Sequence, residues 1–155
     1  MPFERSHAPP GSPALLWDES HFWGILLLRA LEKWEVPFHL LRSRDIARGA
    51  LKRLCPPALL VPGGWASRKA RGLGGQGRRE IREYVYRGGQ YLGFCGGAGL
   101  ALRTNSPQEG LGICPWGRKP LRERLPNCSG HVSLQAECGS PFCPDNLDQL
   151  QAPVW

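Results

Sequence analysis

The chain has 155 residues, 41% of them hydrophobic, and a formal net charge of +7. This length and composition suit one globular domain with its own core, so folding requires neither disulfides nor a metal. The positive charge is spread over scattered arginines with few aromatic residues between them, which favours a solvated basic surface over a nucleic-acid site.

The N-terminus lacks the pattern of a signal peptide, and the longest apolar run, at 22–28, is too short to cross a bilayer. We therefore expect a cytoplasmic protein with no membrane partner. In that compartment the six cysteines are expected to be free thiols, metal ligands or a nucleophile rather than disulfide partners.

Apolar runs alternate with helical patterns along most of the chain. A polar, proline-rich segment at 1–13 is expected to be loose, ahead of a single domain at 14–155. Strands are predicted at 14–17, 36–41, 58–61 and 90–94, helices at 21–34, 45–54, 78–87 and 96–103, and a basic, glycine-rich loop at 66–77. The alternation predicts an α/β fold, an open and mainly parallel sheet with helices on both faces, whose functional residues lie at the carboxyl ends of the strands.

The regular pattern fades beyond residue 103. Residues 110–114 and 131–135 are predicted strands that could pair as a hairpin, and the segment from 139 to 155 has little pattern.

Cys95 lies between small residues where the fourth predicted strand gives way to a helix. Glycines at 93 and 97 leave the space that a sharp strand-to-helix turn needs around a nucleophile. Free N–H groups at the start of a helix also stabilise a thiolate. The pattern predicts a nucleophile elbow at Cys95, with a buried structural cysteine as the alternative.

A second glycine turn, Pro62-Gly63-Gly64, follows the third predicted strand. Backbone N–H groups of Gly64 and Gly96 could converge on the oxyanion formed when Cys95 attacks a carbonyl. The alternative is a pair of glycine turns without chemistry.

His131 is the only histidine after Cys95, and Glu137 is the acid near it. An imidazole could take the thiol proton and later deliver it to a leaving group, which makes His131 the candidate base. A partly exposed strand histidine is the simpler interpretation.

Polar residues also follow the first predicted strand. Asp18, Glu19 and His21 are expected near the same edge as Cys95, where an acid could hydrogen-bond the thiol. Capping of the following helix by Asp18 or Ser20 explains the acids and the serine more simply.

Two further patterns do not support a cofactor. Cys128, His131, Cys138 and Cys143 have ligand types that suit zinc, but their spacing is not that of a standard zinc site. The glycines at 72–77 match G-x-G-x-x-G, yet they follow their strand too late for a dinucleotide fingerprint and are interpreted as a flexible loop. We expect neither a metal nor an organic cofactor.

Three motifs in order resemble a known family: LLVPGG at 59–64, REIREYV at 79–85 and GGQYLGFCGGA at 88–98. The arrangement over roughly 14–103 is similar to the class I glutamine amidotransferase-like superfamily, with a flavodoxin-like sheet. More narrowly, it is similar to the biotin protein ligase N-terminal domain family. The resemblance implies that Cys95 is the nucleophile position and that the glycine loop at 62–64 is the oxyanion wall.

The chain departs from this pattern in two respects. Active glutamine amidotransferases carry a later histidine and glutamate, but no His-Pro-Glu element follows Cys95 here; a C-terminal truncation would explain its absence. Gly96 also stands where PfpI-type relatives carry histidine.

The resulting hypothesis is an amide hydrolase or amidotransferase that acts on an amide or other small-molecule substrate through a thioester on Cys95. The alternative is a catalytically inactive binding or regulatory domain of the same fold, for which a partner protein or a second copy is a candidate.

Overall fold

The computed structural model describes residues 8–104, 110–117, 130–135 and 149–154. The chain forms two compact units, Met1–Arg118 and Lys119–Trp155. The first unit contains most of the predicted strands and helices.

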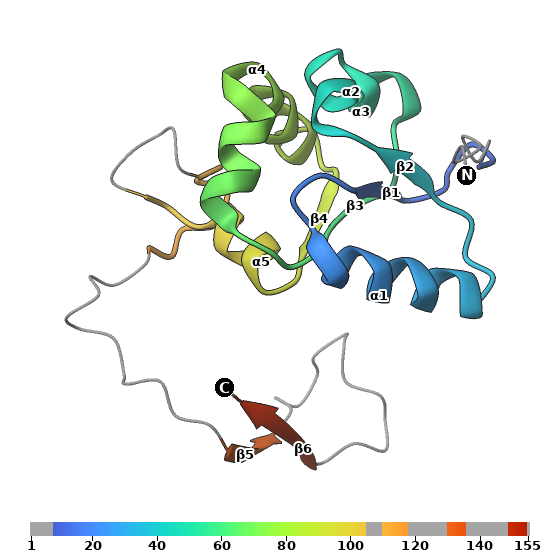
Figure 1. Cartoon of the computed structure of the whole chain (residues 1–155). Coiled ribbons are helices and arrows are strands. Elements are labelled where there is room, and N and C mark those ends of the chain that lie inside the picture. Colours follow the sequence, from blue (N-terminus) through green and yellow to red (C-terminus); the bar gives the residue numbers. More distant parts are fainter. Residues whose placement is uncertain (1–7, 105–109, 118–129, 136–148, 155) are drawn as a thin grey trace. The chain divides into compact units, whose positions relative to one another are not determined.

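The first unit is built on four parallel strands (Figure 1). Their order across the sheet is β2-β1-β3-β4, and the register pairs Leu15 with both Leu40 and Leu60. The bounds are Ala14–Leu16 for β1, His39–Leu41 for β2, Ala58–Val61 for β3 and Gln90–Gly93 for β4. β1 and most of β3 are buried, as the uniformly apolar runs predict for parallel strands covered on both faces.

Helices cover both faces of this sheet. α1 lies along one face, where Leu28 and Leu31 pack with Leu15 and Leu60, and α2, α3 and α4 lie on the other (Figure 1). Their bounds are His21–Lys33 for α1, Ser43–Ala47 for α2, Ala50–Leu54 for α3, Ala66–Tyr86 for α4 and Gly96–Ala101 for α5. The predicted open α/β sheet is therefore confirmed.

Two helix predictions were wrong in their extent. The helix predicted at 45–54 is two short helices, because Gly49 takes a left-handed φ of 78° between them. The loop predicted at 66–77 is largely helical and belongs to α4, interrupted at Gly74, where φ is 63° and ψ is −175°. Burial of Ala70 and Leu73 in the core outweighs the low helix propensity of the surrounding glycines.

The predicted strand at 110–114 was also wrong. This segment is irregular, and its N–H groups donate to carbonyls at the end of α5: Leu111 to Leu100, Gly112 to Leu102 and Cys114 to Ala101. These carbonyls have no partner within the helix, so the segment completes its C-terminus instead of a sheet.

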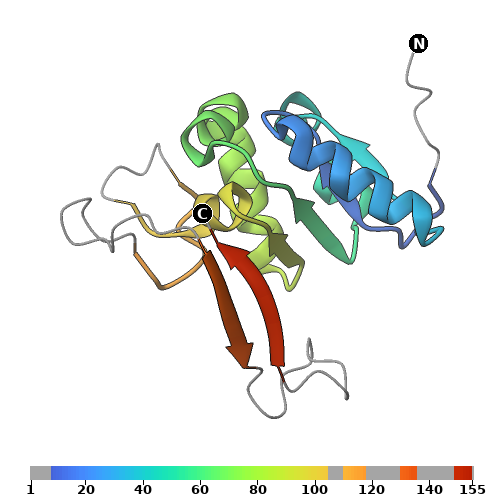
Figure 2. The same cartoon turned by 60° about the horizontal axis from the view of Figure 1, so that its bottom comes forward.

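The second unit contains an antiparallel pair, β5 at Gly130–Gln135 and β6 at Gln149–Val154 (Figure 2). The strand predicted at 131–135 is confirmed, with His131 opposite Pro153. Its partner is β6, however, not the predicted 110–114, and β6 lies in a segment where no pattern indicated a strand. A strand of this kind is stabilised by pairing rather than by its own alternation.

Candidate functional site

Three turns lie at the carboxyl edge of the sheet, near the point where the strand order reverses. β1 is followed by β2 on one side, and the chain then crosses to β3 on the other side of β1. In open α/β sheets ligands bind at such a switch point. The turns are the β1–α1 turn (residues 17–20), the glycine loop (residues 62–64) and the cysteine turn (residues 93–97).

Cys95 lies between β4 and α5 in a backbone conformation that L-residues rarely adopt. Its φ is 49° and its ψ is −112°, and it is an exposed free cysteine at the N-cap of α5. Its carbonyl accepts the Gly99 N–H at 2.9 Å, and the Gly97 N–H donates to Phe94 at 2.7 Å. The local sequence therefore places the thiol on a tight turn at the start of a helix, as predicted.

The glycine loop lies directly against the cysteine turn. A Cβ at Gly96 would overlap the Gly64 carbonyl oxygen, and a Cβ at Gly97 would overlap the Val61 carbonyl oxygen. Gly64 itself has a φ of 115°, and a Cβ there would overlap the Glu19 carbonyl oxygen. The structure thus brings together the predicted residues Gly64 and Gly96 and adds the β1–α1 turn to the same contact.

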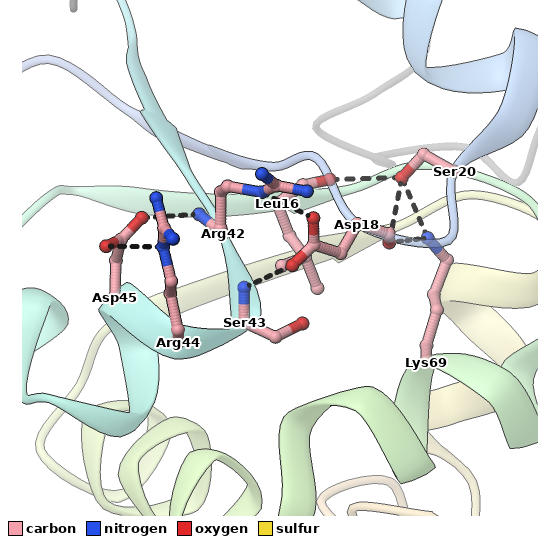
Figure 3. Close-up of polar contacts among 8 residues, drawn as sticks. All are labelled: Leu16, Asp18, Ser20, Arg42, Ser43, Arg44, Asp45 and Lys69. Atoms are coloured by element: carbon pink, nitrogen blue, oxygen red, sulfur yellow. Dashed lines mark hydrogen bonds and ion pairs between the residues drawn. The ribbon is translucent and has the colours of Figure 1, made fainter.

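Asp18 connects the β1–α1 turn to α2 (Figure 3). Its carboxylate accepts the Arg42 Nε–H at 2.9 Å and the Ser43 backbone N–H at 2.8 Å. Burial, the largest influence, raises the pKa of Asp18, but the hydrogen bonds from Ser43 and Arg42 and the Arg42 charge together bring it below 3.8. Asp18 therefore caps the N-terminus of α2.

This arrangement corrects the predicted capping of the first helix. α1 has no side-chain hydrogen bond from its N-cap, Ser20. The Ser20 hydroxyl lies instead 3.1 Å from the Leu16 carbonyl oxygen and 2.8 Å from the Lys69 ammonium. Asp18 and Ser20, the two predicted caps of α1, therefore bind α2 and α4 instead.

Lys69 extends from α4 into the β1–α1 turn with only 1% of its surface exposed. Its Nζ donates to the Ser20 Oγ at 2.8 Å and to the Asp18 carbonyl oxygen at 3.1 Å (Figure 3). Burial lowers the pKa of Lys69 to about 8, although the charges of Glu19 and Asp18 act in the opposite direction. Sequence reasoning missed this residue because it assigned its segment to a solvated basic loop.

A polar cavity of about 460 Å³ opens beside these contacts. Its walls come from the β1–α1 turn, the start of α1, the start of α2 and α4. The lining residues are Trp17, Asp18, Glu19, Ser20, His21, Arg42, Ser43 and Gly72.

The remaining predicted site residues lie in other parts of the chain. His131 lies on β5 in the second unit. Glu137 lies outside the described residues, as do Cys128, Cys138 and Cys143, whose spacing did not match a standard zinc site. Within the described ranges no group of histidine, cysteine and acidic side chains could hold a metal ion.

We expect Asp18→Asn to lower the free energy of unfolding by about 1 to 2 kcal/mol at pH 7, because the ionised carboxylate holds two hydrogen bonds. Because the pKa of Asp18 is lowered in the folded chain, this contribution is present above the ordinary carboxyl pKa and is lost as pH falls through the lowered value. Urea unfolding at pH 7 and at pH 3 measures the difference. Glu32→Gln, which removes an exposed i,i+3 ion pair with Arg29, should change stability very little; an equal effect in both variants would contradict the assignment.

The fold defines an open α/β protein with four parallel strands and a cysteine turn that contacts the glycine loop at the carboxyl edge of the sheet. Residues 46–105 match the family model described as "Biotin-protein ligase, N terminal". The resemblance to this family is thereby confirmed for the segment that carries the glycine loop, α4 and the cysteine turn.

No significant match was found among curated proteins or among solved structures. Among the described residues, no helix has the length and apolar character needed to cross a membrane.

Proposed function

We propose that this biotin protein ligase N-terminal-type chain acts as an amidotransferase-like or hydrolase-like domain with Cys95 as its nucleophile. The observation that carries the proposal is the left-handed φ of 49° at Cys95, at a strand-to-helix junction whose neighbouring glycines admit no side chain. Backbone strain of this kind concentrates at functional sites, because the surrounding structure must maintain it.

In the proposed reaction the Cys95 thiolate attacks the carbonyl carbon of an amide. The C–S bond forms, and the carbonyl electron pair moves to the oxygen, where the N–H groups of Gly64 and Gly96 would stabilise it. The C–N bond then breaks, the amine leaves with a proton, and water hydrolyses the thioester. The base predicted from the sequence, His131, lies on β5 of the second unit, and its role stays a prediction.

A wider membership in the class I glutamine amidotransferase-like superfamily is part of the proposal. It is supported by the parallel strand order 2-1-3-4 and by the position of Cys95 after the fourth strand. The substrate class proposed from this membership is an amide or a related small carbonyl compound.

Cys55 offers a matched comparison for the reactivity of Cys95. Both are exposed and both have positive φ, 42° for Cys55 and 49° for Cys95. Cys55, however, ends α3, and its thiol donates to the Lys52 carbonyl oxygen at 3.2 Å. Cys95 lies instead at the N-cap of α5, on the tight turn that follows β4.

We therefore expect iodoacetamide at pH 7 to alkylate Cys95 about tenfold faster than Cys55, measured by peptide mass spectrometry over time. Cys55→Ser should leave the rate at Cys95 unchanged, and Cys95→Ser should remove the fast phase. Equal rates at the two thiols would overturn the proposal.

The polar cavity favours a second candidate, a binding domain without turnover, because it offers a ligand site at the same edge whether or not Cys95 reacts. Acylation with p-nitrophenyl acetate separates the two. A nucleophilic Cys95 gains one acetyl group and releases p-nitrophenolate, whereas a binding domain shows no acetylation of Cys95 above that of Cys55.

A further inference from the structure

Lys69 is a buried cation at the carboxyl edge that the proposed reaction does not use. Only 1% of its surface is exposed, and its ammonium reaches from α4 to two acceptors on the β1–α1 turn, the Ser20 hydroxyl and the Asp18 carbonyl. Burial of a charged amine is unfavourable unless hydrogen-bond partners compensate it. An apolar side chain would fill this position on α4 at lower cost, so the amine is best explained by what it holds.

The turn that Lys69 holds is strained on both sides of Ser20. Glu19 has a φ of 57° and His21 a φ of 48°, both in the left-handed region. Such conformations persist only where other contacts maintain them. The two hydrogen bonds from Lys69 fix Asp18 and Ser20, the residues that flank Glu19.

The strained turn lies against the glycine loop. The Glu19 carbonyl oxygen occupies the place where a Cβ of Gly64 would be, and the His21 Cδ2 lies 3.5 Å from that Cβ position. Gly64 in turn lies against Gly96, next to Cys95. A continuous series of contacts therefore leads from the Lys69 ammonium to the backbone around the thiol.

We propose that Lys69 is a positioning residue, whose ammonium holds the β1–α1 turn against Gly64 and so keeps the Gly64 N–H in place for the oxyanion formed at Cys95. This inference rests on the proposed function of Cys95. Lys69 acts through the turn, because its two hydrogen bonds go to the Ser20 hydroxyl and the Asp18 carbonyl.

Two reagents distinguish a positioning role from a general structural one. In acylation by p-nitrophenyl acetate, the C–S bond to the acetyl carbon forms through an oxyanion, and the C–O bond then breaks to release p-nitrophenolate. Alkylation by iodoacetamide displaces iodide at a saturated carbon and forms no oxyanion. Displacement of the Gly64 N–H should therefore slow acylation but not alkylation.

The test compares Lys69→Met with wild type and with Lys52→Met, which replaces an exposed lysine on α3. We expect Lys69→Met to slow acetylation of Cys95 about tenfold or more, since loss of one oxyanion donor typically costs 10²–10³ in rate. Alkylation of Cys95 and of Cys55 should stay within about twofold, and Lys52→Met should change neither reaction.

Unchanged acetylation in a folded Lys69→Met protein would overturn the positioning role and leave the role of Cys95 intact. Failure of the wild-type protein to acetylate Cys95 faster than Cys55 would instead overturn the proposed function. If Lys69→Met does not fold, Ser20→Ala makes the same test, because it removes one of the two acceptors and keeps the lysine; a normal acetylation rate in that variant counts against the proposal.

Discussion

Gly96→Ala is expected to destabilise the first unit by about 3 kcal/mol or more, one of the largest effects of a single methyl group in this chain. The added Cβ would overlap the Gly64 carbonyl oxygen, which belongs to the backbone and has no side-chain freedom to move away. Gly64 cannot move away from Gly96 either, because the Glu19 carbonyl oxygen packs against Gly64. Urea unfolding followed by far-ultraviolet circular dichroism measures the shift in midpoint.

Gly75→Ala is the matched control for this prediction. Gly75 lies in α4 at a negative φ, and nothing lies within 4 Å of its Cβ position. The added methyl should stabilise the protein by about 0.5 to 1 kcal/mol, because alanine loses less entropy than glycine when a helix forms. If Gly96→Ala unfolds at the same urea concentration as wild type, the close contact between the glycine loop and the cysteine turn is wrong.

The sheet could be predicted because its signal is local. β3 is a run of four apolar residues, ALLV, and its burial follows from that run alone. The cysteine turn could be predicted for the same reason, since GFCGGA combines the end of a strand with small residues that suit a sharp turn. The contact between Gly64 and Gly96 followed from placing both turns at one edge of a parallel sheet.

The polar contacts at the edge could not be predicted, because they join residues far apart in the chain. Arg42 meets Asp18 across 24 positions, and Lys69 meets Ser20 across 49. Lys69 is followed by several glycines, so that local propensity favours a loop over a buried helix. Only the packing of α4 against the sheet turns this lysine toward the β1–α1 turn.

The segment that matches the family model does not contain all the residues that hold the glycine loop in place. The matched segment, 46–105, contains the cysteine turn and the glycine loop, whereas Lys69's partners Asp18 and Ser20 precede it. The contacts that hold Gly64 therefore come partly from outside the matched segment. A protein could therefore keep the matched motifs, yet lose the position of Gly64 against the cysteine turn if its β1–α1 turn changed.

The stability of the protein is expected to rise with pH between about pH 8 and pH 10. Burial lowers the pKa of Lys69 from 10.5 to about 8 in the folded chain. Between these values the unfolded chain keeps a proton that the folded chain has released, so removing protons from the solution favours folding. A shift of this size corresponds to a gain of about 3 kcal/mol in the free energy of unfolding over its full range.

Two partly buried tyrosines should reverse this trend above pH 10. Burial raises the pKa of Tyr84 to about 12, and it raises that of Tyr91 as well. Above the ordinary tyrosine value of 10.0 the unfolded chain loses phenolic protons that the folded chain retains, so stability falls as pH rises. The free energy of unfolding should therefore have its maximum near pH 10.

Urea unfolding of wild type and Lys69→Met from pH 7 to pH 11 tests both the rise in stability below pH 10 and the decline above it. The difference between the two proteins isolates Lys69: it should change by about 2 to 3 kcal/mol between pH 8 and pH 10, with wild type gaining. The decline above pH 10 should remain in Lys69→Met and become smaller in Tyr84→Phe. A constant difference between wild type and Lys69→Met would mean that the amine is not buried as described. Below pH 8 a charged Lys69 lowers the free energy of unfolding. A lysine at this buried position is therefore best explained by its hydrogen bonds to the β1–α1 turn, which lies against Gly64.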